Sequence, residues 1–342
     1  MYELQAVSQK LELTGEAACF FGGKENCLTI ARSEGSERPA RLRARVFLRA
    51  RTSVCRWAAL FLQSRTTLNE RLRQIRHVAL DMDGTIYRGH TLFEHTVPFL
   101  KLLTELEIGH TFLTNNSSRS SRDYLAHLKQ MGIAASFDQL RTSTQATVEH
   151  LQRNLPRVRR LFLLGTPSLG EELVAAGFAL AKDDPADEPD AVVVGFDTTL
   201  VFSRLCRAAY WINAGKPFVA THPDWVCPTD QPTVLVDCGS ICAALERATG
   251  RAPDAVLGKP DPAMLSGILR RHKLEPEQLA MVGDRLYTDM AMARKTGTMA
   301  VLVLTGETVA ADVVAAKPTP DLVVGDLGEL GELFRVARKF KE

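Results

Sequence analysis

Four short polar motifs, each directly behind a run of apolar residues, constrain this chain more than any other feature. The first motif is Asp81-Met82-Asp83-Gly84-Thr85, which follows the apolar run His77 to Leu80. Short apolar runs of this kind are typical of buried parallel strands. Because ligands bind beyond the carboxyl ends of such strands, we expect both aspartates at the mouth of a site.

The two aspartates of this motif suit metal-assisted phosphate chemistry. Carboxylates so close together repel each other unless a cation lies between them or one binds a proton. A hard divalent cation would remove this repulsion and neutralise a phosphate while Asp81 attacks it. Asp83 would protonate the departing oxygen and later take a proton from water, which is worth ~10²- to 10⁴-fold in rate. A plain turn remains an alternative for this motif alone, whereas an EF-hand calcium loop is excluded because its later glycine and glutamate are missing.

Two further motifs offer groups that bind a phosphate. Thr114-Asn115-Asn116-Ser117-Ser118-Arg119 follows a predicted strand and places hydroxyl and amide donors before a helix, which favours an anion. Alone, this motif is better explained as an ordinary helix cap. Gly258-Lys259-Pro260-Asp261-Pro262 follows another strand, and its lysine would hold a phosphate oxygen and the Asp81 carboxylate. An exposed lysine before a proline turn is the alternative.

The fourth motif is Gly283-Asp284-Arg285-Leu286-Tyr287-Thr288-Asp289, again behind a strand. Asp284 would complete a metal site and Asp289 would support it, although each residue alone is also explained as a favourable charge at a helix start. Taken together and in this order, the motifs supply the parts that phosphoryl transfer through an aspartate requires.

From His77 onward, short apolar runs alternate with helical patterns, which predicts an α/β protein with parallel sheets and helices on both faces. The predicted strands are His77 to Leu80, Thr111 to Leu113, Leu161 to Leu164, Ala191 to Val194, Pro217 to Ala220, Ala255 to Leu257, Leu279 to Val282, Ala300 to Leu304 and Leu322 to Val324. A helix is predicted from Thr199 to Ile212, with a buried stripe made by Val201, Leu205, Ala208, Ala209 and Ile212 and with Trp211 as a buried anchor.

The segment 1–75 lacks this alternation and carries an arginine-rich stretch from 38 to 56. We expect a poorly ordered extension, with one helix near Asn69 to Arg76 leading into the first strand. A transit peptide is opposed by several glutamates, and a start at a later codon other than methionine also stays open.

Net charge, the length of apolar runs and the cysteines indicate which kinds of partner and which compartment to expect. A formal net charge of +2 over 342 residues gives no reason to expect nucleic acid, and no apolar run reaches the roughly 18 residues of a membrane span. A small-molecule partner is the simpler expectation. The 7 cysteines are scattered and contain no Cys-x-x-Cys pair, so we expect reduced thiols in a cytoplasmic protein.

The four motifs resemble those of the haloacid dehalogenase superfamily, specifically its class IIA phosphatases of the nitrophenylphosphatase, phosphoglycolate phosphatase and ribonucleotide monophosphatase type. The resemblance runs from about His77 to the C-terminus. It implies a magnesium-dependent phosphomonoester hydrolase that acts on a small metabolite through an aspartyl phosphate. It also implies a Rossmann-like core at 76–143 and 237–342 and an inserted α/β cap at 144–236, through which two copies of the chain would pair.

The resemblance also implies roles for individual residues. Asp81 would be the nucleophile and Asp83 the acid and base, and Mg²⁺ would be held by Asp81, Asp83 and Asp284. The expected substrate contacts are made by Thr114, Asn115, Asn116 and Lys259, and Asp289 supports the site. In the cap, His222 and Asp224 follow the strand Pro217 to Ala220 and are candidates to contact the substrate, although a turn explains them equally well.

Three other functions compete. A phosphotransferase or mutase would pass the same aspartyl phosphate to an alcohol. A receiver-like signalling module also has a phosphorylatable aspartate, but it would have no use for Asp83 as a built-in base. A binding protein on an inactive scaffold is disfavoured because Asp81, Asp83, Lys259 and Asp284 are all present.

Overall fold

The computed structural model describes residues 67–229, 231–317 and 319–339. Most of the predicted extension at 1–75 lies outside these residues. Residues 67–74 are helical and lead into the first strand, in agreement with the helix expected near Asn69. Within the described part, no helix combines the length and the apolar composition that crossing a bilayer requires.

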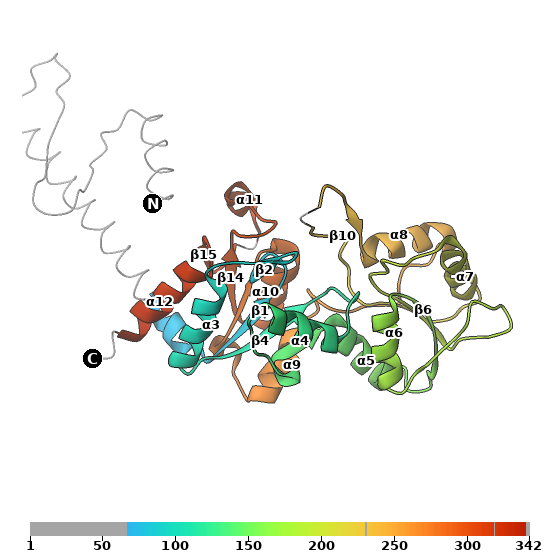
Figure 1. Ribbon diagram of the computed structural model, residues 1–342, viewed down its shortest axis with the longest axis horizontal. Coiled ribbons are helices and arrows are strands. Elements are labelled where there is room, and N and C mark those ends of the chain that lie inside the picture. The colour runs from blue at the N-terminus through green and yellow to red at the C-terminus, as the bar shows by residue number, and fades with distance from the viewer. Residues whose placement is uncertain (1–66, 230, 318, 340–342) are drawn as a thin grey trace, which may run out of the picture. The chain divides into compact units, whose positions relative to one another are not determined.

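The first sheet is parallel and has the strand order β15-β14-β13-β1-β4-β5 (Figure 1). Its strands are β1 (His77–Asp81), β4 (Gly109–Thr114), β5 (Leu140–Thr142), β13 (Leu279–Gly283), β14 (Met299–Val303) and β15 (Leu322–Val324). Every residue of β1, β13 and β14 is buried, which explains why these strands read as continuous apolar runs.

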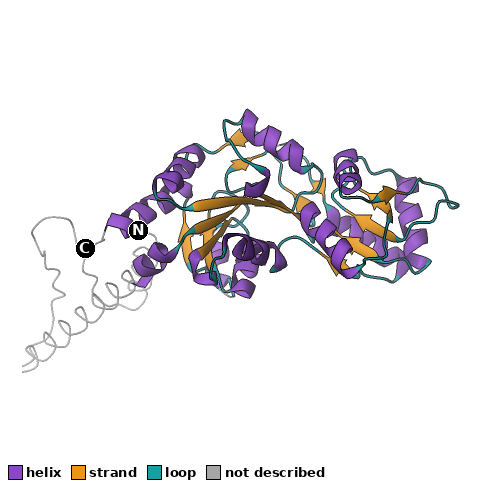
Figure 2. Cartoon of the chain, turned by 90° about the horizontal axis from the view of Figure 1, so that it is seen from below, coloured by secondary structure: helices purple, strands orange, loops and turns teal. Residues whose placement is uncertain are grey.

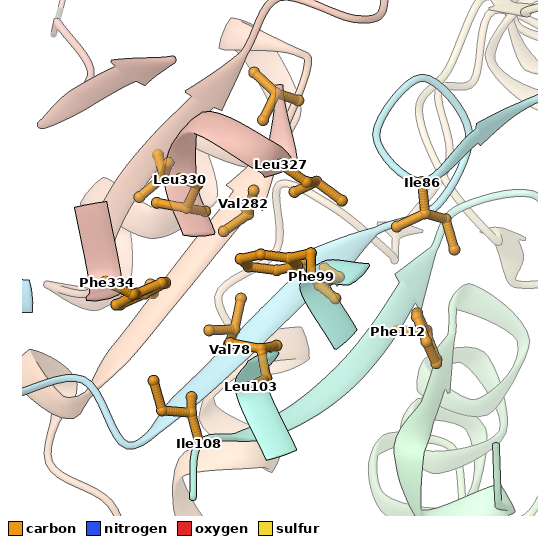
Figure 3. Close-up of a cluster of buried hydrophobic side chains, with 14 of the residues drawn as sticks. Val78, Ile86, Phe99, Leu103, Ile108, Phe112, Val282, Leu327, Leu330 and Phe334 are labelled. Atoms are coloured by element: carbon orange, nitrogen blue, oxygen red, sulfur yellow. The ribbon is translucent and has the colours of Figure 1, made fainter. Parts of the chain in front are cut away.

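Helices cover both faces of this sheet (Figure 2). They are α3 (Thr96–Glu105), α4 (Ser121–Gln130), α5 (Ser143–Asn154), α9 (Ala263–His272), α10 (Ala291–Thr296) and α12 (Leu327–Lys339), whereas α11 (Ala310–Ala315) buries none of its residues. Neighbouring residues of a strand point to opposite faces. Val78 therefore joins a cluster with Phe99 and Phe334 of α3 and α12 (Figure 3), whereas Ala79 packs in the cluster that contains α5, α9 and α10.

A second parallel sheet has the order β12-β9-β8-β6-β7. It contains β6 (Arg160–Leu164), β7 (Ala179–Leu180), β8 (Ala191–Val194), β9 (Phe218–Ala220) and β12 (Ala255–Val256), with helices α6 (Pro167–Ala175), α7 (Phe202–Asn213) and α8 (Cys238–Thr249). Because β12 pairs with β9, this sheet continues beyond residue 236, where the inserted segment was expected to end. The apolar side of α8 packs beside α7 in the same cluster, so α8 also belongs with the second sheet.

Besides short helical turns at Phe137–Gln139, Pro276–Gln278 and Leu286–Met290, the described chain contains two short hairpins. They are β2 (Tyr87–Arg88) with β3 (Thr91–Leu92), and β10 (Val226–Cys227) with β11 (Leu235–Val236). No disulfide links the described cysteines, since Cys206, Cys227, Cys238 and Cys242 are free.

The buried stripe predicted for 199–212 is partly wrong. Ala208, Trp211 and Ile212 are buried as expected, but Val201 is 51% exposed. Val201 is the N-cap of α7 and has extended backbone, so it lies outside the helical period that was assigned to it.

Candidate active site

Three of the four polar motifs lie at the carboxyl ends of neighbouring strands of the first sheet, and the third motif follows β12 of the second sheet. Asp81 is the last residue of β1 and Thr114 the last of β4, and Asp284 follows directly after β13. β1 lies between β4 and β13 in the sheet, which places these three side chains at one edge. Lys259 reaches the same place from the segment between β12 and α9.

Asp81, Lys259 and Asp289 form a buried ionic group. The Lys259 Nζ contacts Asp81 Oδ1 and lies 2.8 Å from Asp289 Oδ1. The Thr85 hydroxyl donates to Asp81 Oδ2 over 3.2 Å. Burial alone would lower the pKa of Lys259, but the carboxylates of Asp289 and Asp81 raise it above its ordinary value, so the lysine is charged.

The site holds more negative charge than Lys259 neutralises. Carboxylate oxygens of Asp81, Asp284 and Asp289 lie within 4.8 Å of one another, and all three residues are buried. Burial, followed by Asp81, raises the pKa of Asp284 to about 8 and that of Asp83 to about 6.

Three buried oxygens in this cluster lack a hydrogen-bond partner among the described residues: Asp83 Oδ1, Asp284 Oδ1 and Asp289 Oδ1, the last of which lies 2.8 Å from the Lys259 Nζ as an ion pair. The other Asp284 oxygen accepts from the Glu307 N–H over 2.6 Å. Buried oxygen atoms are rarely left unpaired, and crowded carboxylates are the ligand set that hard divalent cations prefer. The residues present therefore fit a divalent cation.

Two glycines allow the backbone to approach Asp284 closely. Gly84 has φ +91, and a Cβ there would lie 2.5 Å from Asp284 Oδ2. A Cβ on Gly306 would overlap the same carboxylate. The glycine of the first motif therefore serves both a left-handed turn and the space that Asp284 occupies.

The asparagine side chains of the second motif make hydrogen bonds to other protein groups around the site. Asn115 Oδ1 accepts from the Lys259 N–H over 2.6 Å, and its Nδ2 donates to the Lys259 carbonyl over 2.9 Å. Asn116 Oδ1 accepts from the N–H and hydroxyl of Ser118. Both amides thus have protein partners, while Thr114 lines the pocket beside Asp81. The expected contacts of these residues with phosphate stay predictions.

Of the two residues after β9 that were expected to contact the substrate, only Asp224 lies at the pocket. Asp224 lines the pocket around Asp81 and accepts from Asn115 Nδ2 over 3.1 Å. His222 is fully buried and is not among the residues that line this pocket. Its ring nitrogens lie 2.8 Å from Asp237 Oδ1 and 2.9 Å from the Thr221 hydroxyl, so protein groups occupy both.

The comparisons with known proteins agree with this geometry. Family models described as haloacid dehalogenase-like hydrolase and HAD-hydrolase-like match residues 78–179 and 256–330. A D-glycerol 3-phosphate phosphatase from Mycobacterium tuberculosis is 36% identical, over 73% of this chain and 69% of the relative. The chain belongs to the haloacid dehalogenase-like hydrolases.

Solved structures give the class within this family. A 4-nitrophenylphosphatase from Thermotoga maritima matches with a TM-score of 0.72 and 41% identity, over 77% of this chain and 98% of that chain. A glycerol phosphate phosphatase from Mycobacterium tuberculosis in complex with magnesium matches with a TM-score of 0.69 and 34% identity, over 76% of this chain and 77% of that chain. The chain is a class IIA phosphatase, a hydrolase of phosphoric monoesters.

Arg285 of this phosphatase lies at the site, although the sequence analysis did not identify it as a site residue. It is buried, its Nη1 lies 3.2 Å from Asp224 Oδ2, and its Nε lies 2.9 Å from Glu307 Oε2. Its position directly after Asp284 was the signal that could have identified it. The pocket around Asp81 is lined by Asp81, Asp83, Thr114, Asn115, Asn116, Asp224, Cys227, Pro228, Asp237, Lys259 and Arg285.

Proposed function

We propose that this phosphatase hydrolyses a small phosphomonoester through a phosphoryl group carried transiently on Asp81. The observation that carries the proposal is the buried Asp81 carboxylate, which ends β1 and is held by Lys259 and by the Thr85 hydroxyl. A carboxylate fixed in this way has one defined orientation towards a phosphorus atom, which is what nucleophilic catalysis needs.

Magnesium is the proposed cofactor. Asp81 and Asp284 would bind it through carboxylate oxygens and Asp83 through its main-chain carbonyl, in keeping with the unpaired Asp284 oxygen. When bound, the ion neutralises phosphate charge during transfer. A related glycerol phosphate phosphatase has been solved in complex with magnesium, which supports this choice.

In the first proposed step, an Asp81 oxygen bonds to phosphorus while the bond from phosphorus to the ester oxygen breaks, and Asp83 gives its proton to the departing oxygen. In the second step, Asp83 takes a proton from water as the water oxygen attacks phosphorus, which releases inorganic phosphate and regenerates Asp81. Lys259 keeps its charge throughout and stabilises the negative charge of the transferring group. Thr114 would donate a hydrogen bond to that group.

Replacement of the nucleophile tests this chemistry. Asp81→Asn is nearly isosteric and is expected to lower kcat on a chromogenic aryl phosphate by about 10⁴-fold or more, the order lost when a nucleophile is removed. An unchanged circular dichroism spectrum would show that the fold is intact. Hydrolysis retained in this variant would remove Asp81 from the role of nucleophile.

Metal removal gives a separate test. Treatment with excess chelator is expected to abolish release of inorganic phosphate, because Lys259 cannot balance the crowded carboxylates and a bound phosphate without the divalent charge, and added Mg²⁺ is expected to restore it. Full activity in chelator would contradict a metal-dependent mechanism. Measurement of free phosphate, rather than of the alcohol product, also separates hydrolysis from transfer to an acceptor alcohol.

The proposed substrates are small phosphorylated metabolites. Relatives carry the names D-glycerol 3-phosphate phosphatase and acid sugar phosphatase, and one solved structure is that of a 4-nitrophenylphosphatase. Asp224 and Arg285 line the pocket. In this proposal they would contact the part of the substrate beyond its phosphate. Comparison of kcat/KM across polyol, sugar, nucleoside and pyridoxal phosphates would identify the preferred class.

We also propose that two copies of the chain pair through the hairpin formed by β10 and β11. Four apolar residues on or beside it are exposed: Trp225, Val226, Val234 and Val236. Val226 and Val236 are direct partners across the hairpin, so they share one face. Sedimentation velocity would test this, with a dimer expected for the natural chain and a monomer for Trp225→Glu.

A further inference from the structure

A second hollow lies apart from the site around Asp81. It has a volume of about 180 Å³ and is bounded by β5, α5 and α9. Since one water molecule occupies roughly 30 Å³ in the liquid, this hollow has room for a small organic molecule. None of the residues that line it also lines the pocket around Asp81.

The hollow is strongly basic. Four arginines line it, against two carboxylates: Arg141, Arg153, Arg270 and Arg271, with Asp138 and Glu149. Glu149 accepts two hydrogen bonds from Arg141, at 2.5 and 3.0 Å, and lies 3.8 Å from Arg153. The hydrogen bonds from Arg141 lower the pKa of Glu149, so its charge is already neutralised within the pocket.

Part of this charge has no ion-pair partner at contact distance among the described residues. Arg271 lies 3.5 Å from Asp138 Oδ1, but no carboxylate of the described residues lies within 4.0 Å of Arg270. Arg153, Arg270 and Arg271 lie in the last turns of α5 and α9, where helix dipoles favour cations.

The helix-end effect does not explain Arg141, which lies in strand β5. Its side chain is only 12% exposed, and its Nε lacks a hydrogen-bond partner among the described residues. Leaving a buried donor unpaired costs stability, and more so when the donor belongs to a charged group. An acceptor in the hollow would remove that cost.

From these features we propose that the hollow between β5, α5 and α9 is a binding site for a compact dianion, either a phosphate ester or a dicarboxylate. Guanidinium groups match both chemistries, because they donate pairs of parallel hydrogen bonds to carboxylate or phosphate oxygens. The site is separate from the phosphatase site and does not depend on its chemistry.

Isothermal titration of the full-length protein with succinate, and separately with inorganic phosphate, tests the proposal at 0.15 M salt, which screens weak surface attraction. The test variant is Arg270→Gln/Arg271→Gln, which removes two exposed charges from the pocket. The matched control is Arg122→Gln/Arg157→Gln, which removes two exposed charges elsewhere.

The natural chain and the control are expected to bind at least one of the two anions at this site with equal Kd, and the test variant at least tenfold more weakly. Phosphate also has the site around Asp81 available, so where phosphate binds in the hollow its stoichiometry should fall from two in the natural chain to one in the test variant. Binding of phosphate alone at this site identifies a phosphorylated ligand, and binding of succinate a dicarboxylate. Equal binding by the test variant and the control, or no binding of either anion to the natural chain beyond one phosphate, would overturn the proposal.

Discussion

Asn115 joins segments that lie far apart in the chain. Its side chain pairs with both the N–H and the carbonyl of Lys259, 144 residues away, and donates to Asp224 as well. This fixes the backbone from which Lys259 extends to Asp81. An asparagine is required for this arrangement, because one side chain must supply an acceptor and a donor side by side.

Asn115→Asp is therefore expected to disturb Lys259 without changing side-chain volume. The new oxygen would face the Lys259 carbonyl and the Asp224 carboxylate, so the lysine should shift and kcat should fall by up to ~10²-fold. Steady-state kinetics would measure this, with the exposed Asn213→Asp as control. An unchanged kcat would show that Lys259 does not need this support.

Residue types could be predicted from the sequence, but not all of their contacts. Asp81, Asp284 and Lys259 were expected at one edge because each follows a predicted strand. Asp81 and Asp284 lie at one edge of the first sheet, and Lys259 meets Asp81 there although it follows β12 of the second sheet. The amide contacts of Asn115 could not be predicted, because they depend on two loops that meet only in the folded chain. His222 was placed near the substrate by its position after β9, yet its ring is engaged by Thr221 and Asp237.

At the scale of elements, β1 carries a titratable group at the end opposite the site. His77 is buried, its Nε2 lies 2.9 Å from the Thr111 hydroxyl, and its ring lies 4.3 Å from that of His272. Burial, followed by His272 and His110, lowers the pKa of His77 to about 3. The folded protein therefore resists protonation here, whereas the unfolded chain takes up a proton near pH 6.5.

This difference predicts a loss of stability in acid. Above pH 6.5 His77 is neutral in both states. As the pH falls from 6.5 towards 3, His77 becomes protonated in the unfolded state but not in the folded state, which favours unfolding. Between pH 8 and pH 5 the natural chain should lose about 2 kcal/mol more free energy of unfolding than His77→Gln. Urea unfolding at both pH values would measure this, and the half-buried His150→Gln should behave like the natural chain.

The strands themselves were predicted well because buried parallel strands are continuous apolar runs. The three-residue strand β5 and the two-residue strands β2, β3, β7, β10 and β11 were not predicted, because such short segments have no period to detect. The start of α7 was placed too early, because Val201 is apolar but caps the helix from outside.

At the scale of the whole molecule, polar side chains connect the two sheets beside the site. Arg285 follows β13 of the first sheet, and Asp224 follows β9 of the second. Their ion pair is buried, with side chains 9% and 7% exposed. Removing one partner of a buried pair leaves the other charge unpaired, which costs more than removing both.

Asp224→Ala is accordingly expected to lower the free energy of unfolding by about 3 kcal/mol. Arg285→Met in the same chain should recover part of this loss, because it removes a buried guanidinium that would otherwise keep only the half-exposed Glu307 as its partner among the carboxylates. A double-mutant cycle by urea unfolding would give the coupling energy. Strictly additive effects would mean that the pair does not connect the sheets energetically.

The path of the chain between the sheets has a consequence for how such enzymes diversify. The chain leaves the first sheet through α5 and returns between β12 and α9, and α5 and α9 pack against each other. The segment between α5 and α9 is thus attached to the first domain at two neighbouring points. We expect that it could be exchanged for another of different size and preference while the aspartates of β1 and β13 stay in place, so that new specificities arise without rebuilding the reaction centre.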